Sequence, residues 1–186
     1  MWNAPAAGKN SGRRDEARRM ARISVDRQRI TPFLWYDEGV AAEAARFYTS
    51  IFPNSRIELG DGGADSLERE ELAVTFWLDG QRFIALNGGP QFSFTPAVSF
   101  FVRCETQAEL DYYWDALLVG GEPSRCGWLR DRFGLSWQIV PDVLGDLLAS
   151  DDRDAAARAM TAMLGMQKID IAELLRAARG DAVESV

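Results

Sequence analysis

The sequence has 186 residues, of which 47% are hydrophobic and 26% charged, as is ordinary for one globular domain. Its 28 acidic residues outnumber 21 Lys and Arg, and a formal net charge of −7 argues against nucleic acid as the main ligand. It contains no run of apolar residues long enough to predict a membrane-spanning helix. It also contains no histidine, which removes the usual general base at neutral pH and the commonest nitrogen ligand for metals.

The N-terminal segment differs in charge from the rest. Residues 1–29 carry eight Lys or Arg and three Asp or Glu, and no apolar segment follows that would make a secretory signal. We interpret residues 1–28 as a flexible extension, or as an over-long start with the working start near Met20; contact with nucleic acid or an anionic surface is the alternative. Cys104 and Cys126 form no CxxC pair, which predicts reduced thiols and a cytoplasmic location.

The first half of the body reads as strand, helix, strand and hairpin. Residues 30–36 are apolar and aromatic, with Pro32 near the beginning, where a strand tolerates proline. A helical spacing of apolar residues follows at Ala44, Phe47, Tyr48 and Ile51. A short strand is expected at 56–59, then a loop over 60–70, then strands at 72–78 and 82–86 joined by the hairpin signal Asp79-Gly80.

The same order then recurs. Residues 98–104 predict a strand, and Thr106 with Glu109 predicts a capping box at the start of a helix. The apolar spacing of the first helix returns at Leu110, Tyr113, Trp114 and Leu117. A final hairpin is expected from 125–130 and 135–140, with Asp131 and Arg132 as a solvated pair beside its turn. The sequence therefore predicts an α+β fold of two βαβββ modules.

These patterns define the predicted domains. Residues 29–141 form one domain, with module one at 29–90 and module two at 97–141, and residues 142–186 form a helical extension. Each module covers one face of its sheet with a helix, so two modules together enclose a concave cavity suited to a small molecule. Gln91, Phe92 and Phe94 are candidates to cover its mouth. The Met-rich stripe of the extension indicates packing, or alternatively a lid or dimer arm.

Several segments carry a family resemblance: ITPFLWY (30–36), AARFYTSIFPNSRI (44–57), FIALNGGPQFSF (83–94), RCGWLRDRFGLSWQIVP (125–141) and MLGMQKIDIAEL (163–174). They resemble the PhnB-like branch of the vicinal-oxygen-chelate, or glyoxalase/bleomycin-resistance, superfamily. The resemblance implies paired βαβββ modules and a homodimer. Members are often labelled demethylubiquinone methyltransferase-like, but this sequence has no glycine-rich strand-to-helix turn of the nucleotide-binding type.

The resemblance also implies where a metal would be held. In metal-dependent relatives the ligands come from the first and last strands of each module, and these positions fall here at Ile30, Val98, Gln138 and Asn87. Aliphatic side chains cannot ligate, and neutral amides replace a carboxylate poorly. We therefore expect no catalytic metal and no cofactor.

Strand alternation extends this set of positions to a predicted pocket. Gln138 facing the cavity brings Ser136 with it and turns Trp137 toward the helix, and Val98 facing the cavity brings Phe100. Gln138 satisfying neighbouring backbone is the alternative. Cys126 is expected on a strand, as an inert or a reactive thiol. The predicted pocket residues are Gln138, Ser136, Asn87, Phe100, Val98, Ile30 and Cys126.

Three functions remain open from the sequence. The first is a metal-independent small-molecule-binding protein, dimeric and cytoplasmic, without nucleic-acid or membrane partners. The second is a metal-dependent lyase or dioxygenase that recruits its metal through Gln138, Asn87 and a carboxylate of the partner subunit. The third is an interaction or regulatory module that uses the basic N-terminal extension and the C-terminal helices. The missing histidines favour the first over the second.

Overall fold

The computed structural model describes residues 28–37, 39–58 and 72–181. The chain divides into two units, 1–32 and 33–186, and every helix and strand described belongs to the second. Most of the predicted N-terminal extension and the predicted loop over 60–70 lie outside the described residues. In chain order the elements are β1 (Phe33–Tyr36), α2 (Ala41–Ile51), β2 (Arg56–Ile57), β3 (Ala73–Leu78), β4 (Gln81–Asn87), β5 (Ser99–Cys104), α3 (Gln107–Leu117), β6 (Glu122–Pro123), β7 (Trp128–Arg130), β8 (Ser136–Pro141), α4 (Asp142–Leu148), α5 (Arg153–Gly165) and α6 (Ile171–Arg179).

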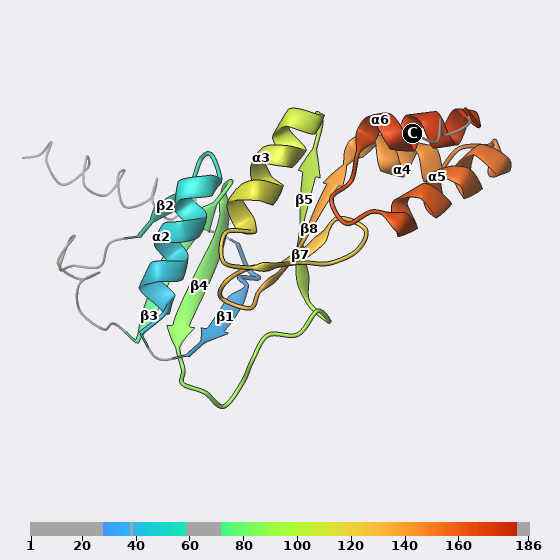
Figure 1. Cartoon of the computed structure of the whole chain (residues 1–186). Helices are drawn as coiled ribbons and strands as arrows, with labels where there is room; N and C mark the ends of the chain where they lie inside the picture. The colour runs from blue at the N-terminus through green and yellow to red at the C-terminus, as the bar shows by residue number, and fades with distance from the viewer. Residues whose placement is uncertain (1–27, 38, 59–71, 182–186) are drawn as a thin grey trace, which may run out of the picture. The chain divides into compact units, whose positions relative to one another are not determined.

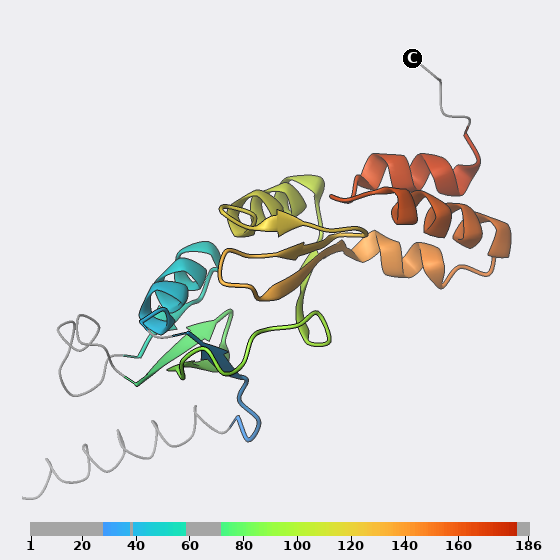
Figure 2. The same ribbon diagram turned by 60° about the horizontal axis from the view of Figure 1, so that its bottom comes forward.

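The strands form two four-stranded sheets with the same topology. Their orders are β1-β4-β3-β2 and β5-β8-β7-β6. In each sheet the first strand runs parallel to the last strand of its module, and the other neighbours are antiparallel. One helix covers one face of each sheet, α2 in the first module and α3 in the second (Figures 1 and 2). The predicted α+β fold of paired βαβββ modules is confirmed.

Local signals in the sequence account for the turns and the start of α3. Asp79 and Gly80 both adopt positive φ, 44° and 77°, as the two-residue hairpin between β3 and β4 requires. Thr106 Oγ1 accepts the Glu109 N–H at 3.2 Å, and the Glu109 carboxylate accepts the Glu105 N–H at 2.8 Å. The predicted cap is therefore present, with its return bond one residue before the N-cap.

The core lies between each sheet and its helix. In module one, Leu34, Phe76 and Ala85 face the buried side of α2, where Ala44 and Tyr48 are fully covered. In module two the helix side holds Leu129, Trp137 and Ile139 of the sheet and Leu110, Tyr113, Trp114 and Leu117 of α3. The apolar spacings seen in the sequence thus become the packed faces of the two helices.

The segment between α5 and α6 is bound to module two through backbone and side-chain hydrogen bonds. Cys126 and Gly127 donate their N–H groups to the carbonyls of Met166 and Gln167, both at 2.8 Å. The Gln107 amide accepts the Ile171 N–H at 2.9 Å and donates to the Ile169 carbonyl at 3.1 Å. These bonds fix the C-terminal helices to the turn before β7 and to the start of α3.

We predict that Gly127→Ala destabilises the protein by at least about 1–2 kcal/mol. Gly127 has φ of 80°, and a Cβ there would lie 2.6 Å from the Ile139 carbonyl oxygen. The control is Gly145→Ala in α4, where a Cβ meets nothing within 4 Å and the helix should gain about 0.5–1 kcal/mol. Denaturant unfolding of both variants checks this, and equal or same-signed effects would contradict it.

Candidate functional site

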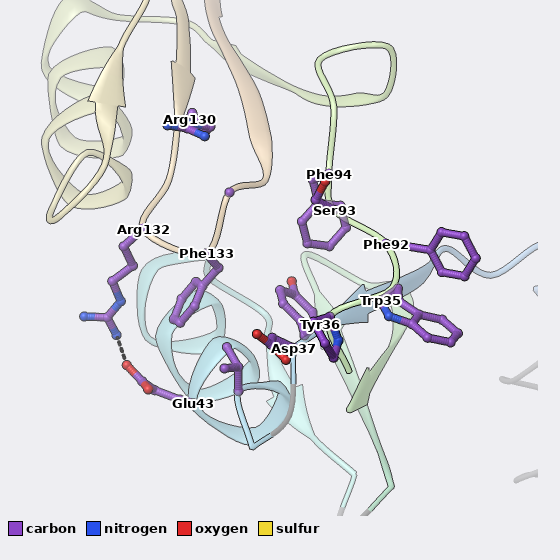
Figure 3. A pocket seen from close by; sticks show the side chains of 13 residues that line it. Trp35, Tyr36, Asp37, Glu43, Phe92, Ser93, Phe94, Arg130, Arg132 and Phe133 are labelled. Carbon is purple, nitrogen blue, oxygen red and sulfur yellow. Dashed lines mark ion pairs between the residues drawn. The ribbon is translucent and has the colours of Figure 1, made fainter. Parts of the chain in front are cut away.

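A cavity of about 550 Å³ lies where the end of β1, the start of α2, the segment after β4 and the β7–β8 turn come together (Figure 3). Its lining combines aromatic rings with a few charged side chains. The lining residues are Trp35, Tyr36, Asp37, Val40, Glu43, Pro90, Phe92, Ser93, Phe94, Arg130, Arg132, Phe133 and Gly134. Phe92 and Phe94, two of the three candidates to cover the mouth of the predicted cavity, are among them. The lining draws on both modules, so neither module alone forms this cavity.

The aromatic wall is held by edge-to-face contacts. Phe133 meets the rings of Tyr36, Phe47 and Tyr48 with centroids 6.2, 5.5 and 5.8 Å away. Tyr36 also meets Phe94 at 5.1 Å. Such arrangements contribute beyond apolar burial, because the positive ring edge faces the negative ring surface. The wall is therefore a fixed set of rings.

A buried carboxylate supports this wall from behind. Asp131, only 3% exposed, accepts the Tyr48 hydroxyl at 2.7 Å and the Trp137 indole N–H at 2.8 Å through Oδ2. Its Oδ1 accepts the N–H groups of Phe133 and Leu135 at 2.9 and 3.0 Å. Tyr36 extends the network by donating to the Tyr48 hydroxyl at 3.3 Å. The prediction that Asp131 is a solvated turn residue is wrong, because its side chain folds inward as the acceptor for four donors.

Burial dominates the titration of this network. Removal from water raises the pKa of the Asp131 carboxyl above its usual value, although the bonds from Trp137, Tyr48, Leu135 and Phe133 lower it in part. Burial also raises the pKa of the Tyr48 and Tyr36 hydroxyls, and the carboxylate adds to both shifts. Both tyrosines are therefore neutral hydrogen-bond donors at physiological pH.

Two of the predicted pocket residues lie on the open face of the second sheet. Gln138 is half-buried there and donates from Nε2 to Ser99 Oγ at 2.8 Å. Ser136, two residues earlier on the same face, is 5% exposed. Neither lines the 550 Å³ cavity. The Gln138 amide has a side-chain partner on the neighbouring strand rather than the backbone partner considered as an alternative.

Phe100 lies on the opposite face from Gln138, so the prediction that the two share a face is wrong. The register pairs Phe101 with Gln138 and Phe100 with Trp137. The Phe100 ring accordingly contacts Trp137 at 5.4 Å and Phe83 at 5.2 Å on the helix side. An error of one residue in a strand moves every side chain to the other face.

The remaining predicted residues have other positions. Asn87 Oδ1 accepts the Ala41 N–H at 2.8 Å and so caps α2, which lacks a side-chain cap of its own. Cys126 is not on a strand: it sits in the turn before β7 with φ of 60°, next to Gly127 at 80°. Two left-handed residues in succession cannot continue a strand. Val98 and Ile30 precede β5 and β1 and are 67% and 85% exposed.

Sequence reasoning missed the residues that build the cavity wall. The patterns place Tyr36, Tyr48 and Phe133 only in a strand, a helix and a turn, whereas Tyr36 and Phe133 line the cavity and Tyr48 packs behind Phe133. One local signal was available, because an Asp two residues before the bonded N–H is the pattern of an Asx turn. That signal predicts the bond to Phe133. It does not predict burial, which depends on Tyr48, 83 residues away.

Comparison with known proteins finds a matching family model and several similar solved structures. A family model described as 3-demethylubiquinone-9 3-methyltransferase matches residues 28–140. The PhnB protein of Bacillus cereus is 35% identical, with 61% of this chain and 99% of that chain covered and a TM-score of 0.52. A protein from Pseudomonas aeruginosa is 18% identical, with 60% of this chain and 96% of that chain covered and a TM-score of 0.49. A glyoxalase/bleomycin resistance protein from Albidiferax ferrireducens is 13% identical, with 57% of this chain and 92% of that chain covered and a TM-score of 0.38. No curated protein matches this chain.

We predict that Asp131→Asn destabilises the protein by about 1–3 kcal/mol. Four donors converge on the carboxylate, and an amide supplies one acceptor oxygen and presents an NH2 group to the rest. The Trp137 N–H would then lose its acceptor. The control is Asp146→Asn on the exposed side of α4, expected to change the unfolding free energy by at most about 0.5 kcal/mol. Equal stabilities of the two variants would contradict the prediction.

The same variant has a defined pH dependence. Because the pKa of Asp131 is raised in the folded state, the folded protein holds this proton more tightly than the unfolded chain. Wild-type stability relative to Asp131→Asn should therefore fall as pH rises from the usual carboxyl pKa of 3.8 through the raised value, and then level off. Unfolding free energies measured between mildly acidic and neutral pH check the sign. A relative stability that rises over this window would show that the hydrogen bonds outweigh burial.

Proposed function

We propose a binding function for this chain, which belongs to the 3-demethylubiquinone-9 3-methyltransferase (PhnB-like) family. It binds a small organic molecule in the cavity between the β1–α2 and β7–β8 turns. The observation that carries the proposal is the cavity itself. Its volume of about 550 Å³ lies within the range of small-molecule pockets, and its lining of rings with a few polar groups is their usual composition. The hydrogen-bond network of the buried Asp131 holds two of the lining residues, Tyr36 and Phe133.

The residues at the family's metal positions do not fit a catalytic divalent cation. Ile30 and Val98 carry no donor atom, and the Gln138 amide is bonded to Ser99. Asn87 uses its oxygen to cap α2. Within residues 28–37, 39–58 and 72–181, no three His, Cys, Asp or Glu side chains come together as a possible metal site. These positions favour binding over a metal-dependent lyase or dioxygenase reaction, and we derive no step through a metal.

The description of the family names a methyl transfer, but Gly88 and Gly89, the paired glycines that the structure describes after β4, do not form a cofactor cradle. Gly88 and Gly89 follow β4 and precede no helix. The ring of Trp35 occupies the place that a side chain at Gly88 would take, and its Nε1 donates to the Gly89 carbonyl at 2.9 Å. The segment that contains these glycines thus serves to fix one aromatic wall of the cavity. We propose binding without a cofactor.

We further propose a homodimer located in the cytoplasm. Phe33 and Phe101, which lie on the faces of the two sheets away from the helices, are each 56% exposed. Apolar rings on an open sheet face are expected to be covered by another surface. Cys104 and Cys126 are both free thiols, in keeping with a reducing compartment. Among the described helices, none has the length and apolar character to cross a bilayer.

We predict that Ser93→Trp abolishes most binding of any small molecule that stabilises the wild-type protein in a thermal-shift screen. Ser93 is exposed and lines the cavity, so an indole there takes up space that a bound molecule needs. Affinity should fall at least about tenfold, or about 1.4 kcal/mol. Ser93→Ala and Thr95→Trp, the latter exposed and outside the lining, should retain affinity within about twofold. Undiminished binding by Ser93→Trp would remove the cavity as the site.

We also predict that the purified protein carries no stoichiometric zinc, nickel, iron or manganese. The reason is the absence of donor atoms at Ile30 and Val98. Elemental analysis after dialysis measures the metal content. About one transition-metal ion per chain would overturn the metal-independent proposal.

Native mass spectrometry of the same sample counts the chains per particle. A single chain at micromolar concentration would overturn the dimer.

A further inference from the structure

Arg132 in the β7–β8 turn is held in place by two rings and one carboxylate. Its guanidinium carbon lies 4.4 Å from the Phe47 ring centroid and 4.8 Å from that of Phe133. Its Nη2 is 3.0 Å from Glu43 Oε1, an ion pair that joins the turn of module two to α2 of module one at the edge of the cavity (Figure 3). The rings fix the guanidinium plane through cation–π contacts, which leaves the carboxylate as its exchangeable partner.

The exposures of the charged side chains indicate that Arg132 is the more rigidly held member of its ion pair. The Arg132 side chain is 35% exposed, against 61% for its partner Glu43. Arg130, the other cavity-lining arginine, is 57% exposed and pairs with the 70% exposed Glu122. An ion pair to so exposed a carboxylate adds little stability, so replacing Glu43 by another carboxylate costs little. The guanidinium fork matches a planar carboxylate with two parallel bonds.

The rest of the lining suits an aromatic body. Tyr36, Phe94 and Phe133 form a continuous set of edge-to-face rings, of which Phe133 contacts Arg132. Trp35 meets Phe92 at 5.0 Å. Flat apolar groups pack on such rings with little loss of freedom. Asp37 also lines the cavity, from the turn between β1 and α2. An acidic ligand would therefore direct its carboxylate toward the β7–β8 turn and away from Asp37.

We infer that the cavity takes an aromatic carboxylate, whose carboxyl group displaces Glu43 from Arg132 while its ring lies against Tyr36, Phe94 and Phe133. This inference rests on the proposed function of the cavity and names the chemical class of its ligand. It assigns opposite roles to two paired residues. Arg132 binds the ligand, and Glu43 competes with it.

The test compares 2-naphthoate with its neutral analogue 2-naphthamide by calorimetry on wild-type protein, Glu43→Gln and Arg132→Gln. Wild-type protein should bind the acid more tightly than the amide. Glu43→Gln should raise the affinity for 2-naphthoate by about two- to fivefold, because the competing carboxylate is gone. Arg132→Gln should lower it by about tenfold or more, because a charged hydrogen bond is lost. Glu43→Gln should leave the 2-naphthamide affinity within about twofold. Arg132→Gln should lower the affinity for 2-naphthamide by less than it lowers that for 2-naphthoate, because the amide carbonyl accepts only a neutral hydrogen bond.

The outcomes separate this inference from the proposed function. If the amide binds wild-type protein as tightly as the acid, or if Glu43→Gln weakens 2-naphthoate as Arg132→Gln does, the carboxylate class is wrong and the pair only holds the turn. The cavity would still be a binding site in the first case. If neither compound binds, the aromatic carboxylate class is overturned, and the Ser93→Trp comparison with screened molecules decides the proposed function. If Arg132→Gln fails to fold, the 2-naphthoate affinity of Glu43→Gln alone decides: a rise supports the carboxylate class, and no rise overturns it.

Discussion

The buried carboxylate of Asp131 is the constraint on which the two-module arrangement depends. A carboxylate removed from water is costly unless its lone pairs are filled. Here they are filled by Tyr48 from module one and by Trp137 and two backbone N–H groups from module two. Moving one module relative to the other would break the Tyr48 bond and leave a charge without its full set of donors. The network therefore specifies how the modules meet.

The same turn that buries Asp131 also shapes the cavity. Asp131 accepts the N–H of Phe133, and this bond fixes the ring that contacts Tyr36, Phe47 and Tyr48. Arg132, between the two, is turned outward onto the rings of Phe47 and Phe133. One turn thus supplies a buried anchor, a cation at the cavity edge and an aromatic wall. Such a division of roles is typical of functional loops carried by a rigid sheet.

The sequence predicted those features that depend on neighbours along the chain. The repeated strand order, the Asp79-Gly80 hairpin and the Thr106–Glu109 cap follow from local spacing and are all present. The faces on which side chains lie and the contacts between distant residues do not follow from local spacing. The face of Phe100 depends on a register that a one-residue error reverses, and the role of Asn87 depends on a helix start 46 residues away. Asp131 reads as polar and solvated until Tyr48 is placed beside it.

The preference for an acidic ligand has to be reconciled with a chain whose formal net charge is −7. Charges on the far surface act through water and salt, and at physiological ionic strength their fields decay over about 8 Å. Arg132 lies against the Phe133 ring and is itself one of the residues that line the cavity. Distant repulsion therefore acts mainly on the rate at which an anion arrives, whereas the bound state is governed by the nearest charges. Selectivity at this cavity depends on one guanidinium held between rings, and on how readily Glu43 leaves it.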